Sequence, residues 1–204
     1  MPVRKSANER KTEIVTAMLR LADELGPDRL TTQSVADAVG VTQPAIFRHF
    51  ATKQDLWLAV AEMISDHLTT AWAEALVASD DPISRIKALI LVQLRQIEAM
   101  PAIPSILFSR ELQVENDSLR NSVQGLMAQL VGLLQNELRA GQGAGVIHPV
   151  LSPKDGALLL VSLVQGLTIR WTLGKRDFAL VPEGRRLLEA QLGLLRNTQA
   201  EVTQ

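Results

Sequence analysis

Apolar residues recur along this chain at the three- and four-residue spacing of amphipathic helices, and no stretch sustains the alternation expected of a strand. Ile14, Met18, Leu21 and Leu25 lie on one helical face in this way. Leucine and alanine dominate, and tyrosine is absent. The pattern predicts an all-α fold of about nine helices.

Turn and capping residues set the expected helix boundaries. Gly26-Pro27 ends the first helix, and Asp81 and Pro82 begin another as N-cap and first helical residue. Thr52 with Asp55 and Ser152 with Asp155 have capping-box spacing. Pro101 and Pro104 interrupt the middle of the chain, and a glycine loop is expected at 141–145. The predicted helices span residues 8–25, 32–39, 43–50, 52–78, 82–99, 105–114, 118–140, 152–173 and 182–197.

The second and third helices form a unit with a small core of their own. Gly40 lies where the chain must turn with positive φ, and Ala36 supplies the small side chain needed where two helices cross closely. The expected apolar core comprises Val35, Ala36, Val39, Val41, Ile46 and Phe50. This spacing matches the helix-turn-helix of DNA-binding proteins, and the alternative is an ordinary corner between two helices.

The exposed face of the third helix favours the first interpretation. Its polar and small residues can contact bases or phosphates, and none of them is acidic: Thr42, Gln43, Ala45, Arg48 and His49. With Thr42 as N-cap, Pro44 falls in the first turn, where a missing N–H has no intrahelical partner. The Thr42 hydroxyl is expected to accept from the Ala45 N–H. Alternatively, Pro44 only starts the helix.

At these residues the sequence resembles the tetracycline-repressor (TetR) family of bacterial transcriptional regulators. The resemblance covers roughly residues 10–58. It is carried by Leu30-Thr31-Thr32, Val35-Ala36, Gly40-Val41, Ile46-Phe47-Arg48-His49-Phe50, and Lys53 with Asp55-Leu56. It implies a dimer with two helix-turn-helix heads, here residues 1–52, and a helical effector-binding and dimerisation body, here residues 53–204.

The resemblance also implies roles for single residues. Phosphate contacts fall on Thr32, His49 and Lys53, base contacts on Gln33 and Gln43, and apolar contacts on Pro44, Ala45 and Phe47. Lys53 is alternatively a solvated surface lysine. Two features depart from the family: Phe47 stands where tyrosine is usual, and the first helix lacks an aromatic residue before Gly26.

The body contains more apolar surface than one subunit needs. Residues 152–173 are apolar on nearly every side, and the last helix has two apolar stripes, which predicts a four-helix dimer interface, with a large monomeric core as the alternative. The expected interface residues are Leu159, Leu163, Leu167, Leu188, Leu192 and Leu195. Methionine and aromatic residues that could line an effector cavity, or simply fill the core, are Trp72, Met100, Phe108, Leu112 and Met127.

Composition adds the expected compartment. There is no cysteine, the N-terminus lacks a signal-peptide apolar segment, and the longest uncharged apolar run, 156–169, is short for a bilayer. We therefore expect a cytoplasmic protein without a membrane partner. The net charge is −1, but residues 1–53 carry a basic excess. Arg4, Lys5, Arg10 and Lys11 could follow a minor groove as a basic arm, or form a solubilising tail.

Enzymatic chemistry finds no support in the motifs. His49, His67 and His148 are the only histidines, and none has metal-ligand spacing to another, so no metal and no cofactor is expected. Glu111 and Glu115 fit a solvated face. The sequence thus predicts a ligand-responsive repressor that binds a pseudo-palindromic double-stranded DNA operator as a homodimer and is released by an unidentified small-molecule effector. The alternative is a helical small-molecule-binding or protein-interaction module without operator reading.

Overall fold

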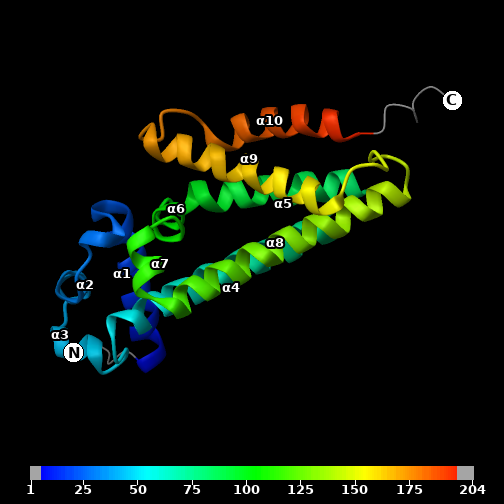
Figure 1. Ribbon diagram of the computed structural model, residues 1–204. Coiled ribbons are helices and arrows are strands. Elements are labelled where there is room, and N and C mark those ends of the chain that lie inside the picture. Colours follow the sequence, from blue (N-terminus) through cyan, green and yellow to red (C-terminus); the bar gives the residue numbers. More distant parts are fainter. Residues whose placement is uncertain (1–5, 197–204) are drawn as a thin grey trace. The chain divides into compact units, whose positions relative to one another are not determined.

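The computed structural model describes residues 6–196, and in that range ten α-helices and one 3-10 helix make up the regular structure, with one isolated bridge between Ile147 and Arg196 (Figure 1). The all-α prediction is confirmed. The helices are α1 Ala7–Leu25, η1 Pro27–Arg29, α2 Thr32–Val39, α3 Gln43–Phe47, α4 Lys53–Val77, α5 Pro82–Ala99, α6 Ala102–Leu107, α7 Arg110–Glu115, α8 Asp117–Gly143, α9 Pro153–Leu173 and α10 Leu180–Leu195.

The chain forms two compact units. The first runs as far as Asp66 and also takes in Met100–Gln124, and the second comprises His67–Ala99 and the chain from Gly125 onward. The long helices α4 and α8 therefore each contribute to both units. The head expected at residues 1–52 falls inside the first unit, and its boundary remains a proposal.

The first unit is built around α1. This helix packs against α2, η1 and α6, and α2 packs against α3. Ser6 and Glu9 form a capping box at its start, and Gly26 ends it with φ 83°. Its buried face carries Ile14 and Met18, which are fully buried. The amphipathic stripe in the sequence thus becomes the core of the unit.

The second unit is centred on α5, α9 and α10, which pack against one another. Gly184 allows α10 to approach α5 closely, because a Cβ at that position would collide with Leu94. An ion pair of 2.7 Å between Lys87 Nζ and Glu189 Oε1 also joins these two helices. Small residues and complementary charges therefore set the closeness of this packing.

Several predicted helix boundaries were wrong. The helix predicted at 43–50 ends at Phe47, and the helix predicted at 105–114 is two helices, α6 and α7. Pro104 lies within α6, at the third helical position, where its missing N–H breaks no intrahelical bond. Gly141 is helical because a side chain there would collide with Ile147, 2.7 Å from the ideal Cβ. The last helix begins at Leu180, and its expected end at Asn197 lies outside the described residues.

The helix α9 is long and apolar enough, by length and composition alone, to cross a membrane. About half of its apolar window, 44%, is buried inside the fold. Its contacts with α5 and α10 account for this composition, since a helix packed on several sides needs apolar residues on several faces.

The expected dimer interface needs correction. Leu167, Leu188, Leu192 and Leu195 are buried inside the subunit, with Leu192 at 0% exposure, so they offer no surface to a partner. They face the packing among α5, α9 and α10 and not a second chain. Leu163 is half-buried, and Leu159 is exposed. The sequence pattern identified excess apolar surface, but it could not tell which stripe the subunit itself covers.

Candidate nucleic-acid interface

The turn between α2 and α3 has the backbone geometry expected from the sequence. Thr31 and Ser34 form a capping box that starts α2. Gly40 ends the helix in the left-handed region, at φ 68° and ψ 38°, and its N–H donates to Ala36 O and Asp37 O. The N–H of Val41 also donates to Ala36 O, at 3.0 Å. A glycine at this position therefore turns the chain without strain into α3.

The start of α3 differs in one detail from the prediction. Thr42 is the N-cap and Pro44 lies in the first turn, as expected, but the Thr42 hydroxyl forms no capping hydrogen bond. The Ala45 N–H instead donates to the backbone carbonyl of Thr42, at 2.9 Å. The Thr42 hydroxyl is exposed and remains able to bind a phosphate.

The two short helices share a compact core. Val35, Ala36 and Ile46 are fully buried and Phe50 is nearly so, whereas Val39 and Val41 are only half-buried. The ammonium of Lys11 lies 5.7 Å from the centre of the Phe50 ring, a cation–π distance. This packing fixes α3 on α2 and leaves its other face open.

Two glutamine side chains on this surface have defined partners. Gln43 Nε2 donates to Thr32 Oγ1 at 2.6 Å and so joins α3 to the start of α2. Gln33 Nε2 donates to Asp37 Oδ1 at 2.7 Å within α2. The first bond orients the Gln43 amide in advance, whereas the second ties Gln33 to an acidic group that repels phosphate. Gln43 is thus the better-prepared base contact of the two.

The other predicted contacts are accessible to different degrees. Thr42, Pro44, Phe47 and Lys53 are exposed, and Thr32, Ala45 and His49 are half-buried. Phe47, at 41% exposure, is a large apolar side chain on the surface. Arg48 is exposed at the end of α3, beside the predicted contacts but not among them, and its position on the charged face was its only signal.

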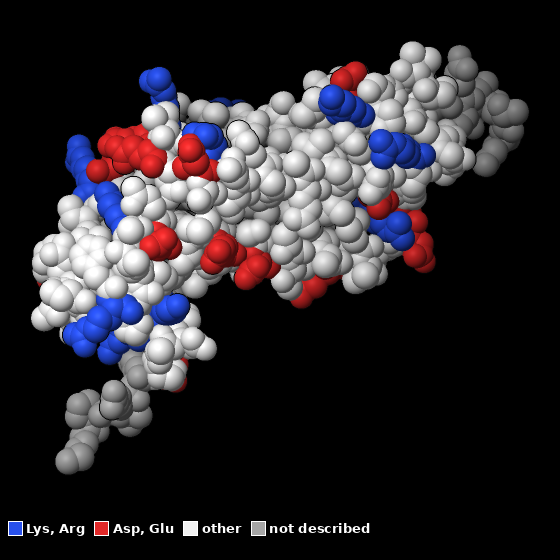
Figure 2. All heavy atoms as spheres, turned by 60° about the horizontal axis from the view of Figure 1, so that its bottom comes forward, with Lys and Arg blue, Asp and Glu red and all other residues white. Residues whose placement is uncertain are grey.

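Basic side chains gather at the end of the molecule that carries α1 to α3, on the face drawn in Figure 2. Arg10 is held there by Glu13, with 2.8 Å between Nη1 and Oε2. Arg4 and Lys5 of the expected basic arm lie outside the described residues. The arm as a whole therefore remains a prediction.

The start of α4 is fixed by hydrogen bonds within the first unit. Thr52 and Asp55 exchange capping bonds, which leaves Lys53 as the first helical residue. Asn116 Nδ2 donates to Gln54 O at 3.2 Å, and Asn116 Oδ1 accepts from Leu119 N at the start of α8. Asn116 thus joins the beginnings of α4 and α8. Sequence reasoning missed it because its partners are distant in sequence.

The expected effector-cavity residues do not form one described site. Trp72 and Met127 belong to the second unit, and Met100, Phe108 and Leu112 to the first. Trp72 is a core residue whose Nε1 donates to the buried Gln93 Oε1 at 2.9 Å. Phe108 is exposed. Leu112 alone of the five lines a described recess, together with Lys53. Across residues 6–196, no cluster of three potential metal-binding side chains occurs.

Comparison with known proteins adds a family to this geometry. A family model described as "Bacterial regulatory proteins, tetR family" matches residues 14–60, which run from within α1 to the first turns of α4. Relatives include two proteins named nucleoid occlusion factor SlmA. The one from Photobacterium profundum is 28% identical over 195 residues, covering 90% of this chain and 96% of the relative. The one from Escherichia coli is 30% identical over 132 residues, covering 65% and 67%.

Solved structures share the fold over nearly the whole chain. A putative transcriptional regulator from Saccharomonospora viridis, in complex with choline, has a TM-score of 0.84 at 20% identity and covers 93% of this chain and 99% of its own. The fatty acid degradation regulator FadR from Bacillus halodurans has a TM-score of 0.78 at 16% identity, covering 93% and 96%. At such identities the likeness concerns the fold alone.

Proposed function

The chain belongs to the tetR family of bacterial regulatory proteins and is a non-enzymatic DNA-binding regulator; from this premise we propose that it is a cytoplasmic repressor which binds a pseudo-palindromic operator as a homodimer and is released by a small molecule. The surface of α3 is the observation that carries the proposal. Its exposed residues include no acid, and its Gln43 amide is held by Thr32.

We assign the contacts by chemistry. Gln43 reads a base edge in the major groove, where an amide can pair with adenine. Thr32, Thr42, His49 and Lys53 contact phosphates, and Lys53 also lies at the positive end of α4. Pro44, Ala45 and Phe47 offer apolar surface to a thymine methyl.

Dimerisation rests on apolar residues that the subunit leaves uncovered. Leu158, Ile169 and Leu173 lie on one face of α9 and are all exposed, and Leu159 lies beside them. Leu194 on α10 is 85% exposed. A row of exposed large apolar side chains on a packed helix is typical of an interface. A second copy of the chain accounts for this surface and supplies the second head that a two-half-site operator needs.

A second candidate function comes from the relatives. Two of them are named nucleoid occlusion factor and match this chain over most or two thirds of their length. A protein with that role uses the same head to bind DNA, but its sites are not operators of regulated genes. The position of the binding sites therefore discriminates between the two functions.

Selection of bound fragments from the host genome, followed by transcript measurement in a deletion strain, tests the proposal. A repressor yields few sites, placed at promoters whose transcripts rise on deletion. Sites spread over the chromosome without transcript changes support the nucleoid occlusion role. Absence of any sequence preference in salt-dependent binding overturns operator reading itself.

A further inference from the structure

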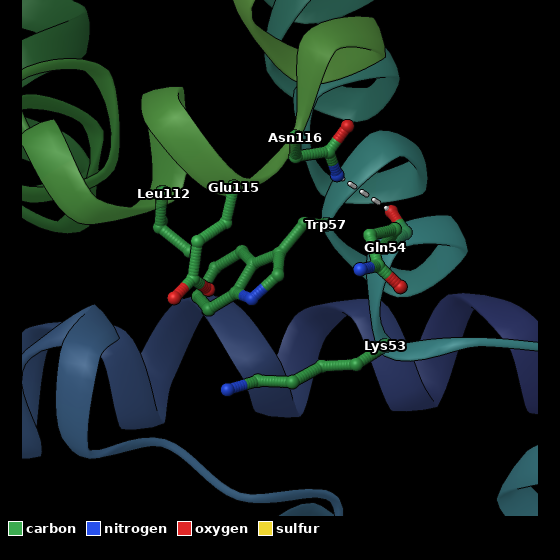
Figure 3. A pocket seen from close by; sticks show the side chains of 6 residues that line it. All are labelled: Lys53, Gln54, Trp57, Leu112, Glu115 and Asn116. Carbon is green, nitrogen blue, oxygen red and sulfur yellow. Dashed lines mark hydrogen bonds between the residues drawn. The ribbon is translucent and has the colours of Figure 1, made fainter.

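A recess lies between the start of α4 and the end of α7, wholly within the first unit (Figure 3). Its empty volume is about 270 Å³, which suits a ligand of a few heavy atoms. The lining side chains are Lys53, Gln54, Trp57, Leu112, Glu115 and Asn116. The recess thus combines an indole, a cation, a carboxylate and an apolar wall.

The indole N–H of Trp57 lacks an acceptor. Trp57 is 2% exposed, and its Nε1 is buried without a hydrogen-bond partner. The other two tryptophans differ, because Trp72 Nε1 donates to Gln93 Oε1 and Trp171 Nε1 donates to Phe178 O at 3.1 Å. A buried donor left unpaired is unfavourable, and a ligand oxygen that accepts from it removes the penalty.

Neighbouring side chains do not satisfy this donor. Asn116 already uses both of its polar atoms, its Nδ2 on Gln54 O and its Oδ1 on Leu119 N. Figure 3 shows the Trp57 nitrogen on the ring edge turned toward Lys53, whose ammonium is itself a donor. The free acceptor must therefore come from a side-chain movement of Glu115 or from a ligand.

Two charged groups of opposite sign complete the lining. Lys53 and Glu115 are exposed, and neither side chain forms an ion pair or hydrogen bond with any part of the described chain. A plain anion would meet the Glu115 carboxylate, and a plain cation would leave Trp57 unpaired. A ligand with an anionic acceptor at one end and a cationic donor at the other satisfies both.

We propose that this recess binds a small free α-amino acid. Its carboxylate accepts from Trp57 Nε1 and pairs with Lys53, its ammonium pairs with Glu115, and its side chain packs on Leu112. Lys53 and Glu115 are long exposed side chains at the rim, so they can turn to admit the ligand.

The site suggests how such a ligand acts, in a step that rests on the proposed function. Lys53 is there a phosphate contact, so a ligand carboxylate that holds Lys53 competes with DNA. The recess is then an effector site beside the head, and the amino acid lowers operator affinity by removing one phosphate contact from each subunit.

Titration with L-alanine, observed through the three ¹⁵N-labelled indole resonances, tests the site without DNA. We expect a saturable downfield shift of the Trp57 indole proton alone, with Trp72 and Trp171 as internal references because their N–H groups are already bonded. Trp57→Phe assigns the resonance and abolishes binding, and unchanged positions of the other two indoles verify the fold. Lys53→Met and Glu115→Gln each weaken binding about tenfold.

Matched probes decide the ligand class. Propionate lacks the ammonium, ethylamine lacks the carboxylate, and inorganic phosphate is a plain anion, so each should bind about tenfold more weakly than L-alanine. A Trp57 resonance that does not move at millimolar L-alanine overturns the site. A shift of equal size and midpoint with phosphate overturns the amino-acid class.

An operator-binding assay with L-alanine tests the effector step separately. A drop in affinity of several-fold for wild type, and none for Trp57→Phe, supports it. Binding of L-alanine with unchanged operator affinity overturns the effector role and leaves the site. A protein that binds L-alanine but no DNA at all overturns the proposed function and not the recess.

Discussion

Gln43 and Lys53 differ in what holds them, and this difference has a measurable consequence. Gln43 is fixed by Thr32 at 2.6 Å, whereas the Lys53 side chain is exposed at the end of α4. Gln43→Ala should cost about 1–3 kcal/mol on the cognate site and relax preference at one base pair. Lys53→Ala should weaken binding to all sequences alike and reduce the salt slope by about one per contact.

Anisotropy titrations on cognate and random duplexes at several salt concentrations check both variants. Thr32→Val serves as a third variant, because it keeps the shape of Thr32 but removes the oxygen that orients Gln43. It should share part of the Gln43→Ala specificity loss. Equal losses for Gln43→Ala on cognate and random DNA would remove Gln43 from base readout.

Phe47 offers a gain-of-affinity test on the same surface. Its ring is 41% exposed, and tyrosine is usual at this position in the family it resembles. Phe47→Tyr should tighten operator binding a few-fold, since a hydrogen bond to a charged group contributes about 1.5–3 kcal/mol before desolvation is subtracted. Phe47→Leu is the control for lost ring area. Weaker binding by Phe47→Tyr than by wild type would place the ring in an apolar contact.

Glu183 gives the fold a pH dependence far from the head. Hydrogen bonds from Arg186 and Arg170 lower the pKa of its carboxyl to about 2. Because this pKa is below that of the unfolded chain, the stabilisation is complete above the unfolded pKa of about 4.3 and is lost as the pH falls from there toward about 2. Glu183→Gln should therefore lose less stability than wild type over this window. Thermal melts at stepped pH measure the difference, and parallel curves would contradict it.

At the scale of elements, Gly40 is the residue on which the head depends most directly. Its φ of 68° is left-handed, and no atom lies within 4 Å of the position its Cβ would take, so the strain of a substitution is in the backbone alone. Gly40→Ala should destabilise the protein by about 1–2 kcal/mol. Gly125→Ala, in α8 with equally open surroundings, should instead stabilise it by about 0.5–1 kcal/mol. Urea unfolding of the pair measures both signs, and destabilisation by both would refute the backbone argument.

Elements with local signals were predictable from the sequence. Gly26, Gly40, Thr52 and Ser152 are caps or turns whose function depends on a few neighbouring residues, and each lies at its expected boundary. Gly141 looked like a loop residue because its helical conformation is supported by a distant contact with Ile147. Local chemistry therefore located the head well and the body less well.

The candidate sites follow the same division. The DNA-facing residues of α3 are consecutive in sequence, so their common surface could be inferred before the structure. The recess joins Trp57 to Leu112 and Glu115, which are far apart in the chain, and its unpaired indole donor is visible only in three dimensions. The buried leucines of α10 show the same limit, since periodicity indicates apolar faces but not what covers them.

At the scale of the whole molecule, the exposed apolar surface of α9 connects the body to DNA binding. Leu159 is 51% exposed, whereas Leu192 is fully buried, so only the first can report on dimerisation without disturbing the subunit core. Leu159→Arg would place an unpaired charge in the proposed interface, which costs several kcal/mol. A monomer offers one head, so operator affinity should fall together with the dimer fraction.

Sedimentation velocity and operator binding, measured on the same samples, check this prediction. Val77→Arg is the matched control, because it adds the same charge at an exposed apolar residue on α4, outside the α9 surface. It should leave both the dimer fraction and the affinity unchanged, and circular dichroism should give native helicity for both variants. Leu192→Arg, in contrast, should lose helicity, since its charge enters the subunit's own core. A helical, monomeric Leu159→Arg that still binds the full operator as tightly as wild type would refute reading by two heads, because one head alone would then supply the whole affinity.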